Sequence, residues 1–356
     1  MPPKLLITGS TGLLGSHIIR AAQKNWHVVG TYHRTTRRQA QYFFGQIDHG
    51  RIDLGDYSET RAMIADVQPA AVIHSAAITD LDYCEKYPDD SQRINLNAAI
   101  DLAALCSDLD VPFLFTSADL VFDGAAAPYT EDDPPTPINV FGEHRALAEE
   151  GILAAYADAV IARLPLLIGY ASLGRESFCH RLVSAFRSGQ EVTLFGDAVR
   201  TPVSTGVAAH GLLQIAGSGF EDDVNISEID RTVGRLHLGG RDQISFYELG
   251  LLTLRILGLN EQLAVPISVL DSYAGLLQTP FLAARSANVS LDSSRAYDLG
   301  YDPPTLRSQL EELLPAAWRA PTPDSDLSET SQPPGESGDT TEDRANPNGD
   351  LSDSTH

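Results

Sequence analysis

The sequence predicts an α/β protein of the Rossmann type, in which a doubly wound parallel sheet is joined to a smaller mixed α/β lobe and a disordered acidic C-terminal tail. The first reason is that short apolar runs alternate with amphipathic helical patterns from the N-terminus to about Pro165. The second is a glycine-rich turn that connects the first apolar run to the first helical pattern. In such a sheet, ligands bind beyond the carboxyl ends of the strands.

Each element of the first half follows from its local pattern. Short continuous apolar runs predict buried strands, and apolar residues repeated every three or four positions predict helices. These patterns place strands at residues 4–7, 27–32, 72–74, 113–116 and 160–164, and helices that end near Gln23 or span 91–109 and 141–156. Farther along, Ser245 and Glu248 have the spacing of a capping box and predict another helix start.

The C-terminal tail differs from the body in composition. Residues 321–356 contain nine acids and one Arg, with many Ser, Thr, Pro and Gly and almost no apolar residues. Such a segment cannot offset its ordering entropy by burial, so residues 319–356 are expected to be disordered. A solubilising role and a partner-binding role both remain open for this tail. We expect residues 1–170 to form the Rossmann domain and residues 171–318 to form the smaller lobe.

The chain is strongly acidic, with a formal net charge of −23 and only three Lys beside 22 Arg. Because the tail accounts for only part of this charge, the surface of the folded body is also acidic. An acidic surface poor in Lys predicts adaptation to high salt, where self-repulsion is screened; a generally acidic protein is the alternative. The charge argues against nucleic acid or an anionic membrane surface as a partner.

No segment indicates export or membrane insertion. Met1 leads almost directly into the first strand, and no apolar run is long enough to span a bilayer. The protein is therefore expected to be cytoplasmic. Cys84, Cys106 and Cys179 lack the spacing of a metal or redox site, so we predict ordinary buried thiols and no metal.

The turn after the first strand predicts a dinucleotide site. Gly9 permits a tight turn, Gly12 lets backbone N–H groups approach a pyrophosphate at the helix N-terminus, and Gly15 lets helix and strand pack closely. A plain structural turn is the alternative, because the spacing is GxxGxxG rather than GxGxxG. The residues expected to contact the cofactor in this turn are Gly9, Thr11, Gly12, Leu13, Leu14 and Gly15.

The second strand ends without the acid that would hold the ribose hydroxyls of NAD. The chain instead supplies His33, Arg34 and Arg37. Guanidinium groups suit a 2′-phosphate, so NADP(H) is favoured over NAD(H) as the cofactor; solvated loop arginines are the alternative. The strand that begins at residue 72 ends in Ala76 and Ala77, small residues that admit the cofactor's backbone.

Several ordered segments carry a family resemblance. They are Val72–Ala77, Asp119–Gly124, Pro137–Gly142, Arg163–Pro165, Arg200–Val203 and Arg285–Asn288. In these segments the chain, from Leu5 to about Leu314, resembles the extended short-chain dehydrogenase/reductases. The match is to the dTDP-4-dehydrorhamnose reductase group and the related beta subunit of methionine adenosyltransferase. The resemblance implies two lobes with crossing chain segments, a nucleotide-sugar ligand and often a homodimer.

The resemblance also assigns roles to individual positions. Asp53 and Leu54 would approach the adenine, and the backbone of Asn95 would help to hold a water near the catalytic Lys. In the family a Tyr protonates the alkoxide left by hydride transfer from NADPH, a Lys acidifies that Tyr and holds the ribose, and a Ser or Thr polarises the carbonyl. The corresponding residues here are Phe141, Arg145 and Ala118.

All three replacements affect the chemistry. Phe141 has no proton to give, Ala118 removes a hydrogen bond, and Arg145 can grip ribose hydroxyls but does not deprotonate in a protein. His144 is a possible substitute donor, whereas Ser117 is expected on the opposite face of its strand.

Three functions therefore remain open. The first is NADPH-dependent reduction of the 4-keto group of a nucleotide-linked deoxysugar, as in dTDP-rhamnose biosynthesis. The second is a non-catalytic NADP-binding subunit that regulates a partner enzyme. The third is an enzyme of altered chemistry, in which solvent or His144 supplies the proton.

Overall fold

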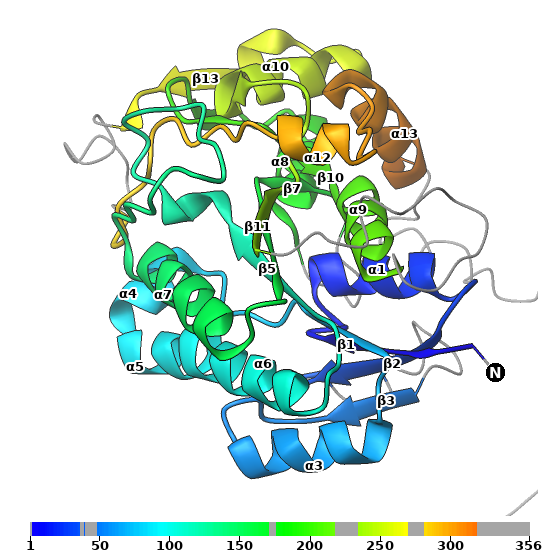
Figure 1. Ribbon diagram of the computed structural model, residues 1–356. Helices are drawn as coiled ribbons and strands as arrows, with labels where there is room; N and C mark the ends of the chain where they lie inside the picture. The colour runs from blue at the N-terminus through cyan, green and yellow to red at the C-terminus, as the bar shows by residue number, and fades with distance from the viewer. Residues whose placement is uncertain are drawn as a thin grey trace, which may run out of the picture. The chain divides into compact units, whose positions relative to one another are not determined.

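The centre of the structure is a parallel sheet of seven strands in the order β11-β6-β5-β4-β1-β2-β3 (Figure 1). The computed structural model describes residues 2–35, 39, 48–170, 176–217, 234–269 and 281–318. The strands of this sheet are β1 (Lys4–Thr8), β2 (His27–Tyr32), β3 (Asp48–Arg51), β4 (Ala71–His74), β5 (Phe113–Ala118), β6 (Val160–Leu164) and β11 (Gly234–His237). Their order and parallel pairing confirm the predicted Rossmann-type α/β fold.

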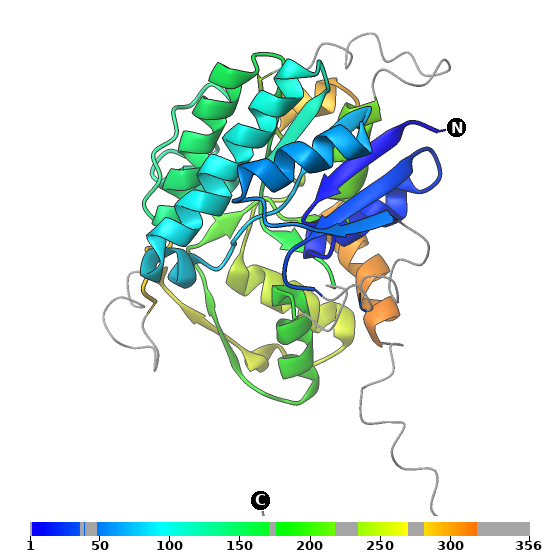
Figure 2. The same cartoon turned by 90° about the horizontal axis from the view of Figure 1, so that it is seen from below.

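Helices cover both faces of the sheet. They are α1 (Leu13–Ala22), α3 (Tyr57–Val67), α6 (Ala98–Asp108), α7 (Val140–Ala155) and α9 (Thr205–Gly217). Helices α1 and α9 pack together on one face, whereas α3, α6 and α7 lie side by side on the other (Figure 2). Successive residues of β1 therefore enter different cores: Leu5 and Ile7 pack with α1, and Leu6 packs with α3 and α6.

Two strands of the sheet have no apolar run and escaped prediction from sequence. They are β3 and β11, with the sequences Asp-His-Gly-Arg and Gly-Arg-Leu-His. β11 pairs with β6 from Gly234 opposite Val160 to His237 opposite Arg163, so residues beyond 170 complete the sheet. Residues Met1–Trp318 pack as one unit. The domain boundary at residue 170 stays a prediction.

The helix predicted over residues 91–109 is divided into three parts. It consists of α5 (Pro88–Ser91), a π-helical segment (Gln92–Asn97) and α6. Short π-helical segments within helices occur frequently at functional sites. This one contains Asn95, whose side chain is fully buried.

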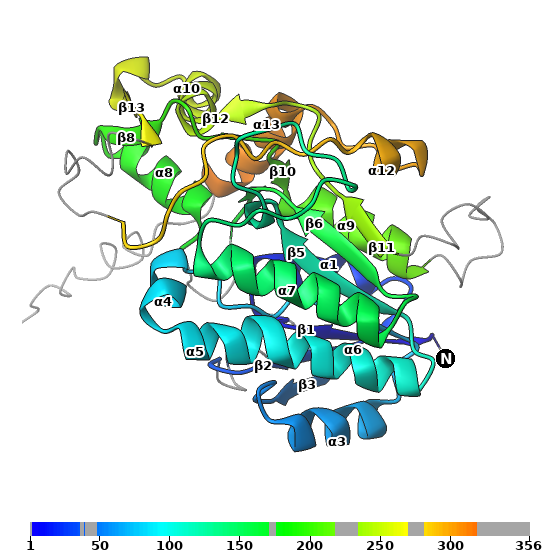
Figure 3. The ribbon, with the colours of Figure 1, turned by 60° about the vertical axis from the view of Figure 1, so that its left-hand side comes forward.

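The remaining described elements form short strand pairs and helices (Figure 3). The pairs are β7 (Leu167–Ile168) with β10 (Val203–Ser204), β9 (Val199–Arg200) with β12 (Ile244–Ser245), and β8 (Val192–Phe195) with β13 (Ala264–Ile267). The helices are α4 (Leu81–Lys86), α8 (Phe178–Arg187), α10 (Phe246–Leu257), α12 (Ser294–Asp298) and α13 (Leu306–Trp318), with 3₁₀ turns at Asp119–Val121 and Glu261–Leu263. The predicted capping box starts α10, because Ser245 Oγ accepts the N–H of Glu248 and the Glu248 carboxylate accepts the N–H of Ser245.

Some expectations concern parts of the chain that the structure does not describe. Arg37 and the tail of residues 319–356 lie outside the described residues. Across the described ranges, no helix combines the length and apolar character needed to cross a membrane. The same ranges hold no group of three or more His, Cys, Asp or Glu side chains suited to a metal ion. Cys84, Cys106 and Cys179 are buried free thiols.

Candidate functional site

The glycine turn between β1 and α1 is closely packed against the end of β4. Gly9 has a φ of +67°, and a Cβ at this position would lie 2.7 Å from the Cα of Ala76, just beyond the end of β4. Gly12 precedes α1 without a side-chain capping bond, and the first turn of α1 contains no acid. Thr11 is buried, and the first-turn residues Leu13 and Leu14 are half-buried. The first turn of α1 thus carries no acid that would oppose an anion at its positive end, and Ala76 lies beside the turn.

Replacing Gly15 by Ala is expected to destabilise the protein by about 1–3 kcal/mol and to weaken dinucleotide binding. A Cβ at Gly15 would overlap the carbonyl oxygen of Gly9 and lie 2.9 Å from the Cα of Ser10, so the turn would have to move. Urea denaturation and a dinucleotide titration measure the two effects. The control is Gly206→Ala in α9, where a Cβ meets no atom within 4 Å. A similar loss in both variants would show that close packing at Gly15 is not the cause.

The loop after β2 is tied to the glycine turn and carries the predicted cations. Thr35 Oγ1 donates to Thr11 Oγ1 at 3.0 Å. His33 and Arg34 are exposed, and the Arg34 guanidinium interacts with the phenol of Tyr83 on α4. The structure therefore places His33 and Arg34 at the end of β2, next to the turn that would hold the pyrophosphate.

Asp53 and Leu54 follow β3, where the family resemblance places the adenine. Asp53 Oδ1 accepts the N–H of Gly55 at 2.9 Å and Arg93 Nη1 at 2.8 Å. Burial tends to raise the pKa of the Asp53 carboxyl, but these two donors outweigh it and hold the pKa below its ordinary value. Leu54 is buried in a small apolar cluster with Ala98. The Arg93 partnership was not predicted, because it joins residues forty positions apart.

The positions of the family's catalytic residues meet where β5 ends and α7 begins. Ala118 is the last residue of β5. The Asn139 side chain caps α7 by accepting the N–H of Gly142 at 2.8 Å, which sets Phe141 in the first turn and Arg145 one turn later. The guanidinium carbon of Arg145 lies 5.5 Å from the centre of the Phe141 ring, and the ring is 4% exposed. The structure therefore brings Phe141 and Arg145, which are predicted to occupy the Tyr and Lys positions, into contact.

Arg145 is held against the sheet by β5. Its Nη2 donates to the carbonyl of Thr116 at 2.9 Å, and its guanidinium carbon lies 4.6 Å from the centre of the Phe115 ring. Its Nε and Nη1 atoms are buried and have no hydrogen-bond partner among the described residues. Burial lowers the pKa of Arg145 to about 10, against the opposing attraction of Glu149. The side chain therefore stays cationic at neutral pH and cannot relay a proton.

His74, which the sequence did not single out, links this region to the glycine turn. Its Nδ1 lies 2.7 Å from the hydroxyl of Thr8, the residue that precedes Gly9. Burial and the neighbouring Arg145 charge lower the pKa of His74 to about 3, so the ring is neutral. Its Nε2 is buried without a partner among the described residues.

The side chains that could replace the tyrosine proton are already engaged. The His144 Nδ1 lies 2.9 Å from Ser91 Oγ, and burial lowers the pKa of His144. Ser117 faces away from the Ala118 side, as expected, and donates to Glu149 Oε1 at 2.6 Å. Thr116 Oγ1 donates to the carbonyl of His74 at 3.2 Å. His144, Ser117 and Thr116 are thus each held by another hydrogen-bond partner.

The Asn95 side chain has a structural task. Its Oδ1 accepts the N–H of Ile78, and its Nδ2 donates to the Ile78 carbonyl and to Ser91 Oγ. These bonds fix the segment after β4 against the π-helical segment. The role of the Asn95 backbone in holding a water stays a prediction.

A buried ion pair joins the end of β5 to β9. Arg200 Nε lies 3.5 Å from Asp119 Oδ2, and the Arg200 guanidinium also donates to the carbonyls of Ser286 and Ala287. Burial raises the pKa of Asp119 to about 6, although the Arg200 charge acts in the opposite direction. This contact fixes the segment from Arg285 to Asn288 next to the residue that follows Ala118.

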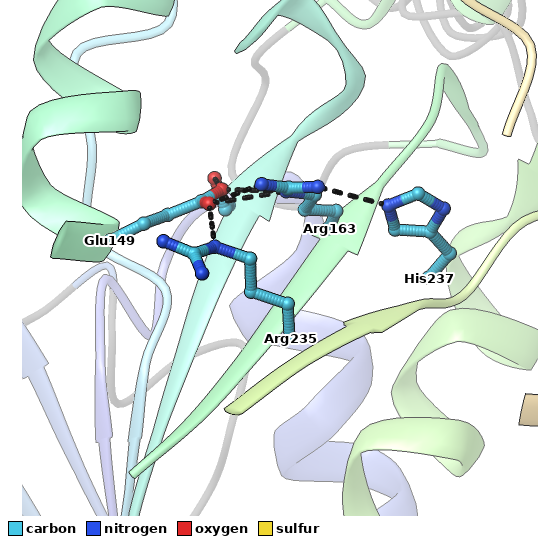
Figure 4. A network of polar contacts seen from close by, with 5 residues as sticks. Glu149, Arg163, Arg235 and His237 are labelled. Atoms are coloured by element: carbon cyan, nitrogen blue, oxygen red, sulfur yellow. Dashed lines mark hydrogen bonds and ion pairs between the residues drawn. The ribbon is translucent and has the colours of Figure 1, made fainter. Parts of the chain in front are cut away.

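A second buried network anchors α7 to three strands (Figure 4). Both carboxylate oxygens of Glu149 accept bonds from Arg163 on β6, and Glu149 Oε2 also accepts from Arg235 Nε on β11 at 2.9 Å. Ser117 supplies the bond from β5. Arg163 and Glu149 are fully buried. Because Glu149 lies one turn after Arg145, the network sets the position of the helix that carries the catalytic positions.

His237 extends the network by accepting a hydrogen bond, without taking up a proton. A guanidinium only donates, so His237 Nε2 accepts from Arg163 Nη1 at 3.3 Å and Nδ1–H donates to the carbonyl of Asp292 at 3.0 Å. Burial, with the Arg163 charge, lowers the pKa of His237 to about 4.

Acidification is expected to destabilise the protein as the pH falls from about 6.5 towards 4. The pKa values of His74 and His237 are depressed, so the unfolded chain binds protons in this window that the native state does not. Each histidine contributes a slope of about 1.4 kcal/mol per pH unit. The pKa of Asp119 is raised, so below about pH 6 the native state binds a proton that the unfolded chain does not. Its contribution to the slope therefore has the opposite sign and offsets that of about one histidine.

Denaturation at several pH values measures this slope. The His237→Gln variant should show a slope smaller by about 1.4 kcal/mol per pH unit than that of the native protein. Equal slopes in the two proteins would contradict the assignment of the titration to buried histidine.

Comparisons with known proteins identify the family and the fold of the chain. Residues 3–318 match the family described as RmlD substrate binding domain. The chain is 30% identical over 314 residues to the probable low-salt glycan biosynthesis reductase Agl14 of Haloferax volcanii, with 86% of this chain and 96% of that protein covered. It is 27% identical over 325 residues to methionine adenosyltransferase 2 subunit beta of Mus musculus, with 89% and 90% covered.

Solved structures share the fold. A dTDP-4-dehydrorhamnose reductase of Bacillus anthracis, in complex with NADP, superposes with a TM-score of 0.72 at 18% identity and covers 89% of this chain and 100% of that chain. A hypothetical dTDP-4-dehydrorhamnose reductase of Sulfolobus tokodaii gives a TM-score of 0.69 at 25% identity, with 83% and 94% covered.

Proposed function

The chain belongs to the RmlD substrate binding domain family, and on that premise we propose that it binds NADP(H) and a nucleotide-linked sugar without reducing the sugar at the rate of a tyrosine-dependent reductase. The resemblance predicted from the sequence is confirmed by the same comparisons. The observation that carries the proposal is the contact between Phe141 and Arg145. A ring without a hydroxyl lies beside a buried guanidinium at the position of the proton donor.

The residues present fit a dinucleotide. A Cβ at Gly9 would fill the turn, and the N-terminus of α1 offers backbone donors to a pyrophosphate. The unpartnered Nε and Nη1 of Arg145 are suited to the hydroxyls of the nicotinamide ribose. NADPH, when bound, supplies a hydride. The structure from Bacillus anthracis is a complex with NADP, and the structure of MoeE5, which shares the fold, is a complex with UDP-glucose and NAD.

The residues at positions 118, 141 and 145 do not support the proton transfer that completes the reduction of a ketone. Hydride transfer to a ketone leaves an alkoxide, and a neighbouring acid must donate a proton to it. Phe141 has no proton, Arg145 stays cationic, and Ala118 cannot polarise the carbonyl. The loss of a general acid alone slows such a step by about 10²- to 10⁴-fold.

A second candidate is a non-catalytic NADP-binding subunit that regulates another enzyme. The observation in its favour is the similarity to methionine adenosyltransferase 2 subunit beta, at 27% to 28% identity in several vertebrates. Such a subunit also needs an intact dinucleotide site and no proton donor. It differs from the first candidate in having no requirement for a sugar.

Binding and turnover should be measured on the same preparation. Calorimetric titration with NADPH is expected to show binding, and single-turnover mixing with a dTDP-linked 4-keto-6-deoxy sugar is expected to show no oxidation at the roughly 1–10³ s⁻¹ typical of enzymes. Oxidation in that range would refute the proposal. Binding of the sugar to the NADPH-loaded protein favours the first candidate, and its absence favours the regulatory subunit.

A further inference from the structure

Arg51 lies beside the place where the adenosine ribose of a bound dinucleotide would sit. It is the last residue of β3, in register with Tyr32 at the end of β2. The N–H and the Oγ of Ser10 in the glycine turn both donate to the carbonyl of Thr31 in β2. The end of β2 is therefore fixed against the turn proposed to hold the pyrophosphate, and Arg51 flanks that end from the next strand.

The side chain of Arg51 is oriented towards the loop after β2. Its Nε donates to the carbonyl of His33 at 3.1 Å. This is its only hydrogen bond within the described residues, so both Nη groups retain their donors. The residue is exposed, so its guanidinium is accessible to a ligand.

The other arginines of this cluster already have partners. Arg93 is paired with Asp53 at 2.8 Å. Arg34 interacts with the Tyr83 phenol, which itself donates to Asp90 at 2.7 Å. Within the described residues, Arg51 has no acidic or phenolic partner, and its one hydrogen bond uses Nε. It therefore differs from Arg93 and Arg34 in having a guanidinium charge that no neighbouring side chain engages.

We propose that Arg51 binds the 2′-phosphate of NADP(H) and is the residue by which this site selects NADP(H) over NAD(H). The inference rests on the proposed dinucleotide site and adds a residue to it. A guanidinium with two free Nη groups matches a phosphate monoester in a bidentate arrangement. The loop after β2 offers no carboxylate among its described residues to hold an unphosphorylated ribose, because Tyr32, His33 and Arg34 occupy those positions.

The test is a set of titrations with NADPH, NADH, 2′,5′-ADP and 5′-AMP. The Arg51→Met variant is expected to bind NADPH and 2′,5′-ADP about 10- to 100-fold more weakly, because one hydrogen-bonded charge contact is lost. Its affinity for NADH and 5′-AMP should change less than about 3-fold, because these ligands lack the phosphate. The matched control is Arg61→Met, an exposed arginine on α3 that should leave all four affinities unchanged.

The outcomes separate the two proposals. If native protein binds NADPH and the Arg51→Met variant retains the native preference for NADPH over NADH, Arg51 does not select the phosphate and this inference is overturned. If native protein binds neither dinucleotide, the proposed function fails, and this inference fails with it. Melting curves of the variants guard against misfolding, and Arg51→Lys should recover part of the preference if charge is the cause.

Discussion

The triple variant Ala118→Thr, Phe141→Tyr, Arg145→Lys is expected to oxidise NADPH with a 4-keto-6-deoxy nucleotide sugar about 10²- to 10⁴-fold faster than the native protein. Asn139 caps α7 and sets the first turn, so a Tyr at position 141 would place its hydroxyl on the same ring axis as the native Phe. A Lys at position 145 would remove the buried guanidinium and provide an ammonium beside that hydroxyl. A Thr at position 118 would restore the second hydrogen bond to the carbonyl oxygen.

The informative control is the double variant Ala118→Thr, Arg145→Lys, which keeps Phe141. It should remain close to the native rate, because the proton donor is still missing. The single-turnover loss of the absorbance of the reduced nicotinamide reports the chemical step. A native rate equal to that of the triple variant would mean that another group donates the proton.

Removing the Glu149 carboxylate is expected to cause the largest loss of stability, about 3–5 kcal/mol for Glu149→Ala. The fully buried Arg163 would lose its counter-ion, and Arg235 and Ser117 would lose their acceptor. An uncompensated charge in a site without solvent costs far more than a broken surface pair. Urea denaturation of the two proteins under identical buffer conditions measures the difference.

The neighbouring residue supplies the control for Glu149. Glu150 is exposed on the same helix turn, and Glu150→Ala should change the free energy of unfolding by about 0.5 kcal/mol or less. The difference between the two variants should persist at high salt, because a buried pair is poorly screened. A Glu149→Ala variant as stable as Glu150→Ala would show that Arg163 finds another partner or is solvated.

The sequence was sufficient to predict the strands whose apolar pattern matches their burial in the structure. β1, β2, β4, β5 and β6 are apolar along most of their length, and each was predicted near its observed position. β11 could not be predicted in this way, because Arg235 and His237 point their polar groups into the Glu149 network and leave no apolar run. A strand whose side chains pair with buried charged groups is polar in composition. Its sequence therefore resembles that of a loop unless its partners are known.

The candidate site shows the same division. Phe141, Arg145 and Ala118 could be proposed from the sequence because a linear motif fixes their spacing, and their role stays a prediction. His74, Arg51 and Arg93 escaped because their importance lies in partners from other elements: the Thr8 hydroxyl, the His33 carbonyl and the Asp53 carboxylate. These partnerships depend on how the strands align in the sheet, which no local pattern specifies.

The position of β11 bears on how the chain is made. Its pairing partner β6 is synthesised about seventy residues earlier. Until β11 follows, β6 is an unpaired edge strand, and the Arg163–Glu149 pair lacks the strand that covers it in the folded protein. β11 can pair with β6 only after residue 237 has left the ribosome, and the pairing must also close the long segment between the two strands. An unpaired edge strand is a template for association with other chains. The nascent protein is therefore most vulnerable to aggregation between these two points, and a fragment ending near residue 170 would keep that vulnerability permanently.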